Sequence, residues 1–99
     1  MNFTLWVSEL AEADLIEAIA YYQGIRPSLA DELELRTKQI MDRVLENPNA
    51  FPKIHGNARR ALMRQFPYSV IFQIRNDRVE VEAVFHGSRA PGRLRNRIG

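Results

Sequence analysis

The amino-terminal half of the chain has the apolar period of α-helices. After a short β-prone stretch, residues 2–7, Ser8 is a candidate N-cap, and Glu9 and Glu12 follow in the first turns, where the helix dipole favours acids. Apolar residues then recur on one helical face at Ala11, Leu15, Ala18, Ile19 and Tyr22. The pattern predicts a strand and then a helix that ends at Gly24.

A second helix is predicted over residues 28–47, where Pro48 stops it. Its apolar stripe consists of Leu29, Leu33, Ile40 and Val44. Arg36 falls inside this stripe, and Glu32, one turn earlier, is a candidate carboxylate partner. Because only a short turn separates the two helices, we expect an antiparallel helical hairpin over about residues 8–47.

The apolar period changes to two in the carboxyl-terminal half. Prolines, glycine and asparagines predict a loop over residues 48–57. A strand is predicted over residues 59–65, and Phe66-Pro67 marks a tight connection. Two further strands flank a hairpin turn at residues 76–77. Their alternating apolar positions are Tyr68, Val70, Phe72 and Ile74, then Val79, Val81, Ala83 and Phe85.

The predicted order of elements is β-α-α-β-β-β in a single domain, residues 1–99. The later strands form a β-meander over about residues 58–86, and a basic carboxyl-terminal arm, residues 87–99, follows it. A helical hairpin followed by a meander indicates the α+β class, with the hairpin packed on one face of a small twisted antiparallel sheet. The first strand is expected to join this sheet beside a later strand.

Charge divides the chain into an acidic and a basic half. Residues 1–50 hold nine acids and four bases, a net of −5, whereas residues 51–99 hold ten bases and three acids, a net of +7. Twelve of the fourteen basic residues are arginines, which make multidentate contacts to carboxylates and phosphates. The basic half therefore points to an anionic partner, either a nucleic acid or an acidic protein.

The composition also bounds the compartment and the chemistry. Cysteine is absent, which excludes a disulfide or a thiolate metal site and fits a reducing cytoplasm. The first residues lack a basic leader and a cleavage site, and no stretch approaches the roughly 20 apolar residues of a membrane span. We therefore expect a cytoplasmic protein with no membrane partner, no cofactor and no metal.

Four stretches, taken in order, resemble the RelE/ParE superfamily of toxins from type II toxin–antitoxin systems. They are AEADLIEAIAYY (11–22), ENPNAFP (46–52), RRALMRQFPYSVIF (59–72) and VFHGSRAPGRLRNR (84–97). The resemblance covers nearly the whole chain and implies the same element order. It also implies a small antitoxin that wraps and neutralises the toxin, with operator DNA contacted only through that antitoxin. RelE-like members cut mRNA on the ribosome, whereas ParE-like members poison DNA gyrase.

One position separates these two branches. A metal-free ribonuclease needs an acid, a base and cations that stabilise the charged phosphorane. In RelE-like toxins, an arginine of the strand motif G-x-Y-R-[VLI]-x-[YF] points at the scissile phosphate. The matching text here is FPYSVIF (66–72), so Ser69 takes the place of that arginine and offers no positive charge. The Phe-Pro-Tyr form is typical of ParE-like and other plasmid-stabilisation members, so the resemblance favours the ParE-like branch.

A ribonuclease would have to use the remaining candidates. His86, at the end of the last strand, is a candidate general acid near neutral pH, and Arg64 and Arg89 are candidate cations. His86 equally suits a structural role, as a hydrogen-bonded residue that fixes the turn into Gly87. In the favoured interpretation, none of these residues is catalytic.

Partner binding is predicted for a set of basic and aromatic residues. Arg60 and Arg64 are expected to share one face of the predicted strand, and Arg59 to take the other. The full set is Arg59, Arg60, Arg64, Tyr68, His86, Arg89, Arg93, Arg95 and Arg97. The alternative is a solvated edge with weak ion pairs, followed by a basic tail that binds nothing. Lys53 and His55 are expected to be solvated loop residues.

The sequence thus predicts a type II toxin that binds DNA gyrase and is neutralised by a small antitoxin. The alternative is a ribosome-dependent mRNA endoribonuclease that uses His86, Arg64 and Arg89. A third interpretation is an antitoxin-binding scaffold without toxicity. In each case, the helical hairpin and the basic sheet are expected to form a groove for an amphipathic, acidic antitoxin segment.

Overall fold

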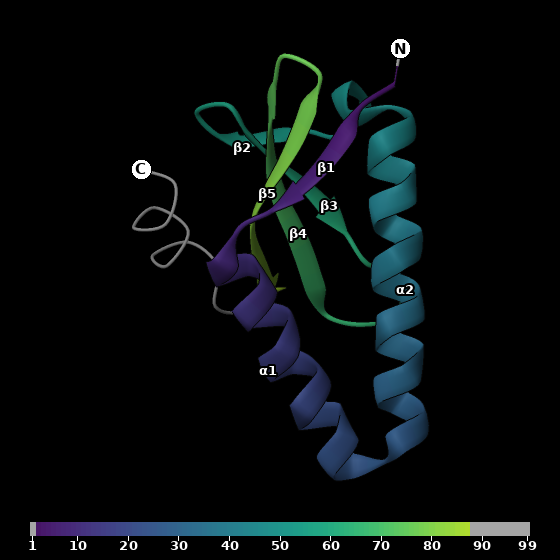
Figure 1. Cartoon of the computed structure of the whole chain (residues 1–99). Coiled ribbons are helices and arrows are strands. Elements are labelled where there is room, and N and C mark those ends of the chain that lie inside the picture. Colours follow the sequence, from purple (N-terminus) through teal and green to yellow (C-terminus); the bar gives the residue numbers. More distant parts are fainter. Residues whose placement is uncertain (1, 88–99) are drawn as a thin grey trace.

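The chain folds in the predicted α+β order. The computed structural model describes residues 2–87, in which two α-helices lie on one side of a five-stranded sheet (Figure 1). The elements are β1 (Thr4–Val7), α1 (Glu9–Ile25), α2 (Pro27–Glu46), the short 3-10 helix η1 (Pro48–Ala50), β2 (Lys53–His55), β3 (Ala58–Leu62), β4 (Tyr68–Arg75) and β5 (Arg78–His86). The helical hairpin, the β4–β5 hairpin and the place of the first strand beside a later one are confirmed.

The connection between the helices is one residue long. α1 runs past Gly24 to Ile25, and α2 begins at Pro27, whose ring fixes φ at a helical value where the missing N–H is not needed. Arg26 between them is extended, with φ −163° and ψ 126°. The predicted boundaries at Gly24 and Ser28 are therefore each wrong by one residue.

The sheet is mixed rather than purely antiparallel. Its strand order is β1-β5-β4-β3-β2, and β1 runs parallel to β5, whereas the other neighbours are antiparallel. Residues 4–7 pair with residues 78–81, so the first strand of the chain lies against the last described one. The connection between these parallel strands consists of both helices, η1 and the strands β2, β3 and β4 (Figure 1).

The predicted loop over residues 48–57 contains a strand, β2, at the other edge of the sheet. Gly56 turns the chain with φ +55°, and residues 53–55 then pair with the start of β3. Pro52 precedes the strand, where its missing N–H removes no ladder bond. β3 ends at Leu62, short of the predicted limit, because the chain turns there toward β4.

A β-bulge in β5 reverses which side chains face the helices. Ile71 lies opposite Ala83 and Phe72 opposite Val81, so Glu82 has no counterpart in β4. The predicted alternation is therefore wrong past the bulge: Ala83 does not share the face of Val81, because one extra residue shifts a period of two. The residues that gather on the face away from the helices are Ala58, Ile71, Ala83 and Phe85.

The main core lies between the two helices and the sheet. α1 contributes the small residues Ala11 and Ala18, which let it approach β5 closely. α2 buries one residue every third or fourth position, including Thr37, whose hydroxyl donates to the Leu33 carbonyl at 2.7 Å. Phe72 is fully buried beneath them. Removing a ring from such a site costs about 3–5 kcal/mol.

The amino-terminal end of α1 closes the edge of β5 that β1 leaves uncovered. β1 ends at Val7, and the Ser8 N–H still donates to the Val81 carbonyl at 3.0 Å. The Ser8 hydroxyl oxygen accepts from the Ala11 N–H at 3.0 Å, which confirms the predicted N-cap. The same hydroxyl donates to the Glu82 carbonyl at 3.4 Å. One residue thus caps the helix and continues the pairing of the strand.

Asp14 extends this closure along β5. Its Oδ2 accepts a hydrogen bond from the Val84 backbone N–H at 3.0 Å, although the two residues are 70 positions apart. A backbone donor that is withdrawn from water costs free energy unless it is bonded, and an open strand edge invites pairing with other chains. Asp14 therefore takes the place of the strand partner that β1 does not provide here.

We predict that Asp14→Ala lowers the free energy of unfolding by about 1–3 kcal/mol, because the Val84 N–H loses its acceptor. Glu12→Ala is the control: it removes an exposed carboxylate from the same helix and should change stability by about 0.5 kcal/mol or less. Urea unfolding followed by circular dichroism measures both. Equal stability of Asp14→Ala and the wild type would contradict this role.

Candidate partner-binding site

A crevice opens between α1 and the adjacent ends of β4 and β5. α1 packs against β5, and the two helices diverge from each other along their length (Figure 1). The crevice has a volume of about 250 Å³ and is lined by Asp14, Glu17, Ala18, Tyr21, Tyr22, Tyr68, Val84, Phe85 and His86. We name it the tyrosine crevice. Two of the predicted site residues, Tyr68 and His86, come together in it.

Aromatic rings form one wall of the tyrosine crevice. Tyr68 and His86 are paired in the sheet, and their ring centroids are 5.4 Å apart with an interplanar angle of 84°. Tyr22, from α1, packs edge-on against Tyr68 at 6.3 Å and against Phe66 at 5.1 Å. Tyr21 in turn lies 5.1 Å from Tyr22. Such pairs contribute about 0.5–1.5 kcal/mol each beyond area burial, so each ring restrains its neighbour.

The polar groups of the tyrosine crevice are acids and hydroxyls. Asp14 and Glu17 contribute carboxylates from α1. Burial raises the pKa of Tyr22, and the neighbouring Tyr21 adds to the increase, so the Tyr22 hydroxyl is neutral at physiological pH. Among residues 2–87, no lysine or arginine lines this crevice. Its chemistry suits a cation or a hydrogen-bonding group, whereas a phosphate oxygen would meet negative charge.

Position 69, where a RelE-like toxin carries its phosphate-facing arginine, and His86 lie on opposite faces of the sheet. His86 shares the helix-facing side with its partner Tyr68. Ser69 is the next residue along β4, pairs with Phe85, and is 5% exposed. Side chains at positions 69 and 86 therefore point to opposite faces of the sheet.

Arg59, a predicted partner-binding residue, holds the segment that precedes β2. Its Nη1 donates to the Phe51 carbonyl at 2.6 Å and to the Asn49 carbonyl at 3.2 Å. The Phe51 ring packs edge-on against Phe72 at 5.9 Å, which ties the same segment to the core. The guanidinium thus serves the fold, and partner contact through Arg59 stays a prediction.

Arg60 and Arg64 do not share a strand face, contrary to the prediction. β3 ends at Leu62, so Arg64 lies in the connection to β4, whereas Arg60 is exposed on β3 itself. Lys53 and His55 are exposed, as expected, but on the edge strand β2 rather than in a loop. The remaining predicted residues, Arg89, Arg93, Arg95 and Arg97, lie outside the described residues.

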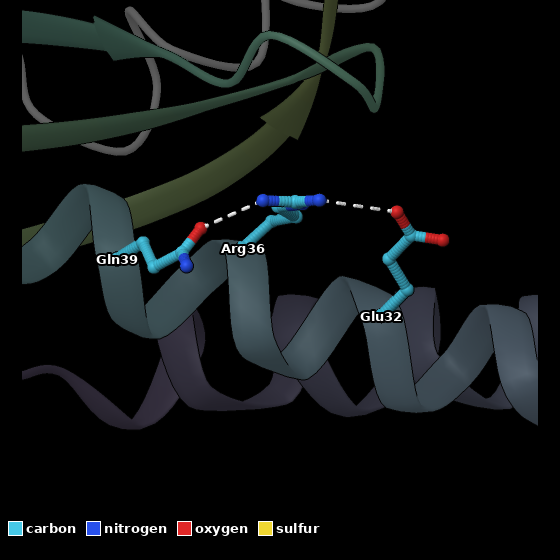
Figure 2. A network of polar contacts seen from close by, with 3 residues as sticks. All are labelled: Glu32, Arg36 and Gln39. Carbon is cyan, nitrogen blue, oxygen red and sulfur yellow. Dashed lines mark hydrogen bonds and ion pairs between the residues drawn. The ribbon is translucent and has the colours of Figure 1, made fainter.

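Arg64 lies in a second crevice, between α2 and the connection from β3 to β4. The crevice has a volume of about 270 Å³ and is lined by Arg36, Gln39, Ile40, Arg43, Leu62, Met63, Arg64 and Gln65. We name it the arginine crevice. The predicted ion pair of Arg36 with Glu32 is confirmed, at 3.4 Å. Figure 2 shows the Arg36 guanidinium between Glu32 and Gln39, whose side-chain oxygen accepts a hydrogen bond at 3.0 Å.

Several crevice residues were not among the sequence predictions. Asp14 has a sequence signal: it stands between Ala11 and Ala18 on the buried face of α1, where an apolar residue is expected. Arg43 lies two turns after Arg36, hence on the same side of α2. Glu17 and Gln65 carry no such signal.

Residues 2–87 contain neither a candidate metal centre nor a candidate membrane span. No group of three or more His, Asp or Glu side chains in this part of the chain lies close enough to hold a metal ion. No helix in the same range is long and apolar enough to cross a bilayer. The candidate chemistry is that of the side chains that line the two crevices.

Comparison with known proteins assigns the chain to a family. A family profile described as "ParE toxin of type II toxin-antitoxin system, parDE" matches residues 6–91. The chain belongs to the ParE toxin family. Two proteins named Toxin ParE2, from Mycobacterium tuberculosis strains CDC 1551 / Oshkosh and ATCC 25618 / H37Rv, are each 30% identical to it over 99 residues. The match covers 99% of this chain and 94% of each relative, which confirms the resemblance to ParE-like toxins.

The ParE fold is also found in a solved structure titled "Chromosomal ParDE TA system from P. aeruginosa". The TM-score is 0.76, the sequence identity is 16%, and the superposition covers 85% of this chain and 95% of the other. At this identity, the similarity establishes a common fold. Membership in the ParE family implies an antitoxin partner.

We predict that Arg59→Ala lowers the free energy of unfolding by about 1–3 kcal/mol, because two loop carbonyls lose their donor. Arg60→Ala removes an exposed arginine from the same strand and should change stability by about 0.5 kcal/mol or less. Thermal unfolding of both variants provides the comparison. If the two variants lose the same stability, the contacts of Arg59 do not hold the loop.

Proposed function

We propose that this ParE-family toxin acts in the cytoplasm by binding and inhibiting DNA gyrase, that it arrests growth, and that a small antitoxin neutralises it. One observation carries the proposal: among residues 2–87, the crevice beside His86 is lined by Asp14 and Glu17 and by no lysine or arginine, so the described part of the chain offers no cation to a phosphate at His86. A charged phosphorane would be destabilised there. A lysine, an arginine or an amide of a protein surface would instead find acceptors and ring faces. Binding is therefore favoured over cutting.

Ser69 gives independent support to this proposal. A RelE-like enzyme would carry a phosphate-facing arginine at this position, whereas the side chain here is a buried hydroxyl on the face away from His86. The Ser69 side chain is uncharged and points away from His86, so the two residues do not suit joint action on one phosphate.

The antitoxin partner is proposed to contribute an amphipathic, acidic segment, and to be the only route by which the toxin contacts operator DNA. α1 supports this assignment, because it has large apolar side chains on its outer surface as well as in the core. The large apolar residues of α1 that are more than half exposed are Leu10, Ile16, Tyr21 and Ile25. The basic half of the chain supplies the complementary charge.

We predict that the purified toxin inhibits DNA supercoiling by gyrase and raises the fraction of cleaved DNA, and that the antitoxin reverses both effects. Tyr68→Ala should weaken inhibition by about tenfold, because it removes a wall of the tyrosine crevice. Trp6→Ala removes an exposed aromatic ring outside that crevice and is the matched control. Gel assays of supercoiling and cleavage measure the outcome. Normal supercoiling in excess toxin would contradict gyrase as the target.

The RelE-like alternative predicts codon-positioned mRNA cuts in a translation extract, and their loss in His86→Ala, Arg64→Ala or Arg89→Ala. We expect intact mRNA. Cuts that depend on His86, together with normal supercoiling, would replace the gyrase proposal with ribosome-dependent cleavage. Intact mRNA, normal supercoiling and unimpeded growth would instead indicate a scaffold that binds the antitoxin without toxicity.

A further inference from the structure

The arginine crevice brings three guanidinium groups to one concave surface. Arg36 and Arg43 project from α2 two turns apart, and Arg64 comes from the connection between β3 and β4. These residues are separated in sequence by the whole of β2 and β3, so the fold, and not local sequence, assembles the cluster. We propose that the arginine crevice binds a carboxylate side chain of the antitoxin. The inference rests on the proposed neutralisation by an antitoxin and names where its acid docks.

The charges of the arginine crevice are not balanced by the described part of the chain. Glu32 pairs with Arg36 at 3.4 Å, and the other ion pairs among residues 2–87 join Arg75 and Arg78 to Glu80. Within that range, neither Arg43 nor Arg64 forms an ion pair. One carboxylate thus faces three guanidinium groups, and the concave surface concentrates the excess positive charge. An anion from outside would complete the cluster.

Arg36 has a second feature that core packing does not explain. Its Nη atoms are held by Glu32 and Gln39 on either side (Figure 2), while its Nε is buried without a hydrogen-bond partner among the described residues. A buried donor without an acceptor lowers stability, and an apolar residue at this stripe position would remove that cost. The Arg36 guanidinium is nevertheless held in place at the crevice. A local loss of stability of this kind is typical of binding sites.

The lining of the arginine crevice favours a peptide over a nucleic acid. Ile40 and Met63 are buried apolar residues, and Gln39 and Gln65 offer amide donors and acceptors to a peptide backbone. Leu62 is 58% exposed and provides apolar contact beside the charge. Apolar and amide groups beside the arginines therefore suit a peptide that carries one acid.

Calorimetric titration of the full-length toxin with the antitoxin encoded by the adjacent reading frame tests the proposal. Arg43→Gln and Arg64→Gln should each weaken binding by about tenfold, and the double variant by about a hundredfold, because each removes a charge-assisted hydrogen bond. Lys38→Gln removes the same charge from an exposed position on α2 and should bind within about twofold of the wild type. Circular dichroism of every variant checks the fold.

The docking acid is located by changing each aspartate and glutamate of the antitoxin to its amide. One such change should weaken binding of the wild-type toxin by about a hundredfold and binding of Arg64→Gln by about tenfold, and it should have no further effect on the double variant, which is the result expected for groups in contact. Arg64→Glu should lose affinity, and a lysine at the docking acid should restore it. The restoration separates a direct ion pair from a general loss of structure.

The outcomes distinguish this inference from the proposed function. If the wild type binds the antitoxin tightly and the double variant binds equally well, the inference is wrong and neutralisation stands. If the wild type does not bind the antitoxin, both are wrong. Loss of gyrase inhibition by the double variant, or of its affinity for a short DNA duplex, with unchanged antitoxin affinity would assign the crevice to the target or to nucleic acid and overturn the inference.

Discussion

The fold depends on how α1 closes the edge of β5. β1 is too short to pair with the whole of β5, and Ser8 and Asp14 supply the missing hydrogen bonds at Glu82 and Val84. These bonds fix the height and rotation of α1 over the sheet. The same helix carries Tyr22, so the closure also sets its distance from the rings of β4. The hydrogen bonds that cover the open edge of β5 therefore also set the position of α1 as a wall of the tyrosine crevice.

The elements with a strong local period could be predicted from the sequence. Both helices, the β4–β5 hairpin and the cap at Ser8 are encoded within a few turns of chain, so the pattern alone identifies them. The bulge at Glu82 could not be predicted, because Val84 and Phe85 are both apolar and the strand reads as apolar in either phase. β2 could not be predicted either, because three residues beside a proline resemble a loop in the sequence. Their strand conformation depends on pairing with β3.

The candidate site was predictable in its residue types but not in its assembly. Tyr68 and His86 stand out in the sequence, and only the register of β4 with β5 shows that their rings touch. The role of Arg59 depends on carbonyls eight and ten residues away, which no periodicity indicates. The arginine crevice lies between α2 and the connection that follows β3, so only the fold brings its arginines together.

The parallel pairing of β1 with β5 also determines how late in synthesis the sheet can form. Residues 4–7 are synthesised before β5 and find their partner only when residues 78–81 have followed. Closing so long a segment is slow, because the entropy of the loop is lost before the contacts between its ends form. The helical hairpin can form earlier, yet the tyrosine crevice needs the end of β5. A chain interrupted before β5 thus lacks both the strand that pairs with β1 and the wall that β5 contributes to the tyrosine crevice.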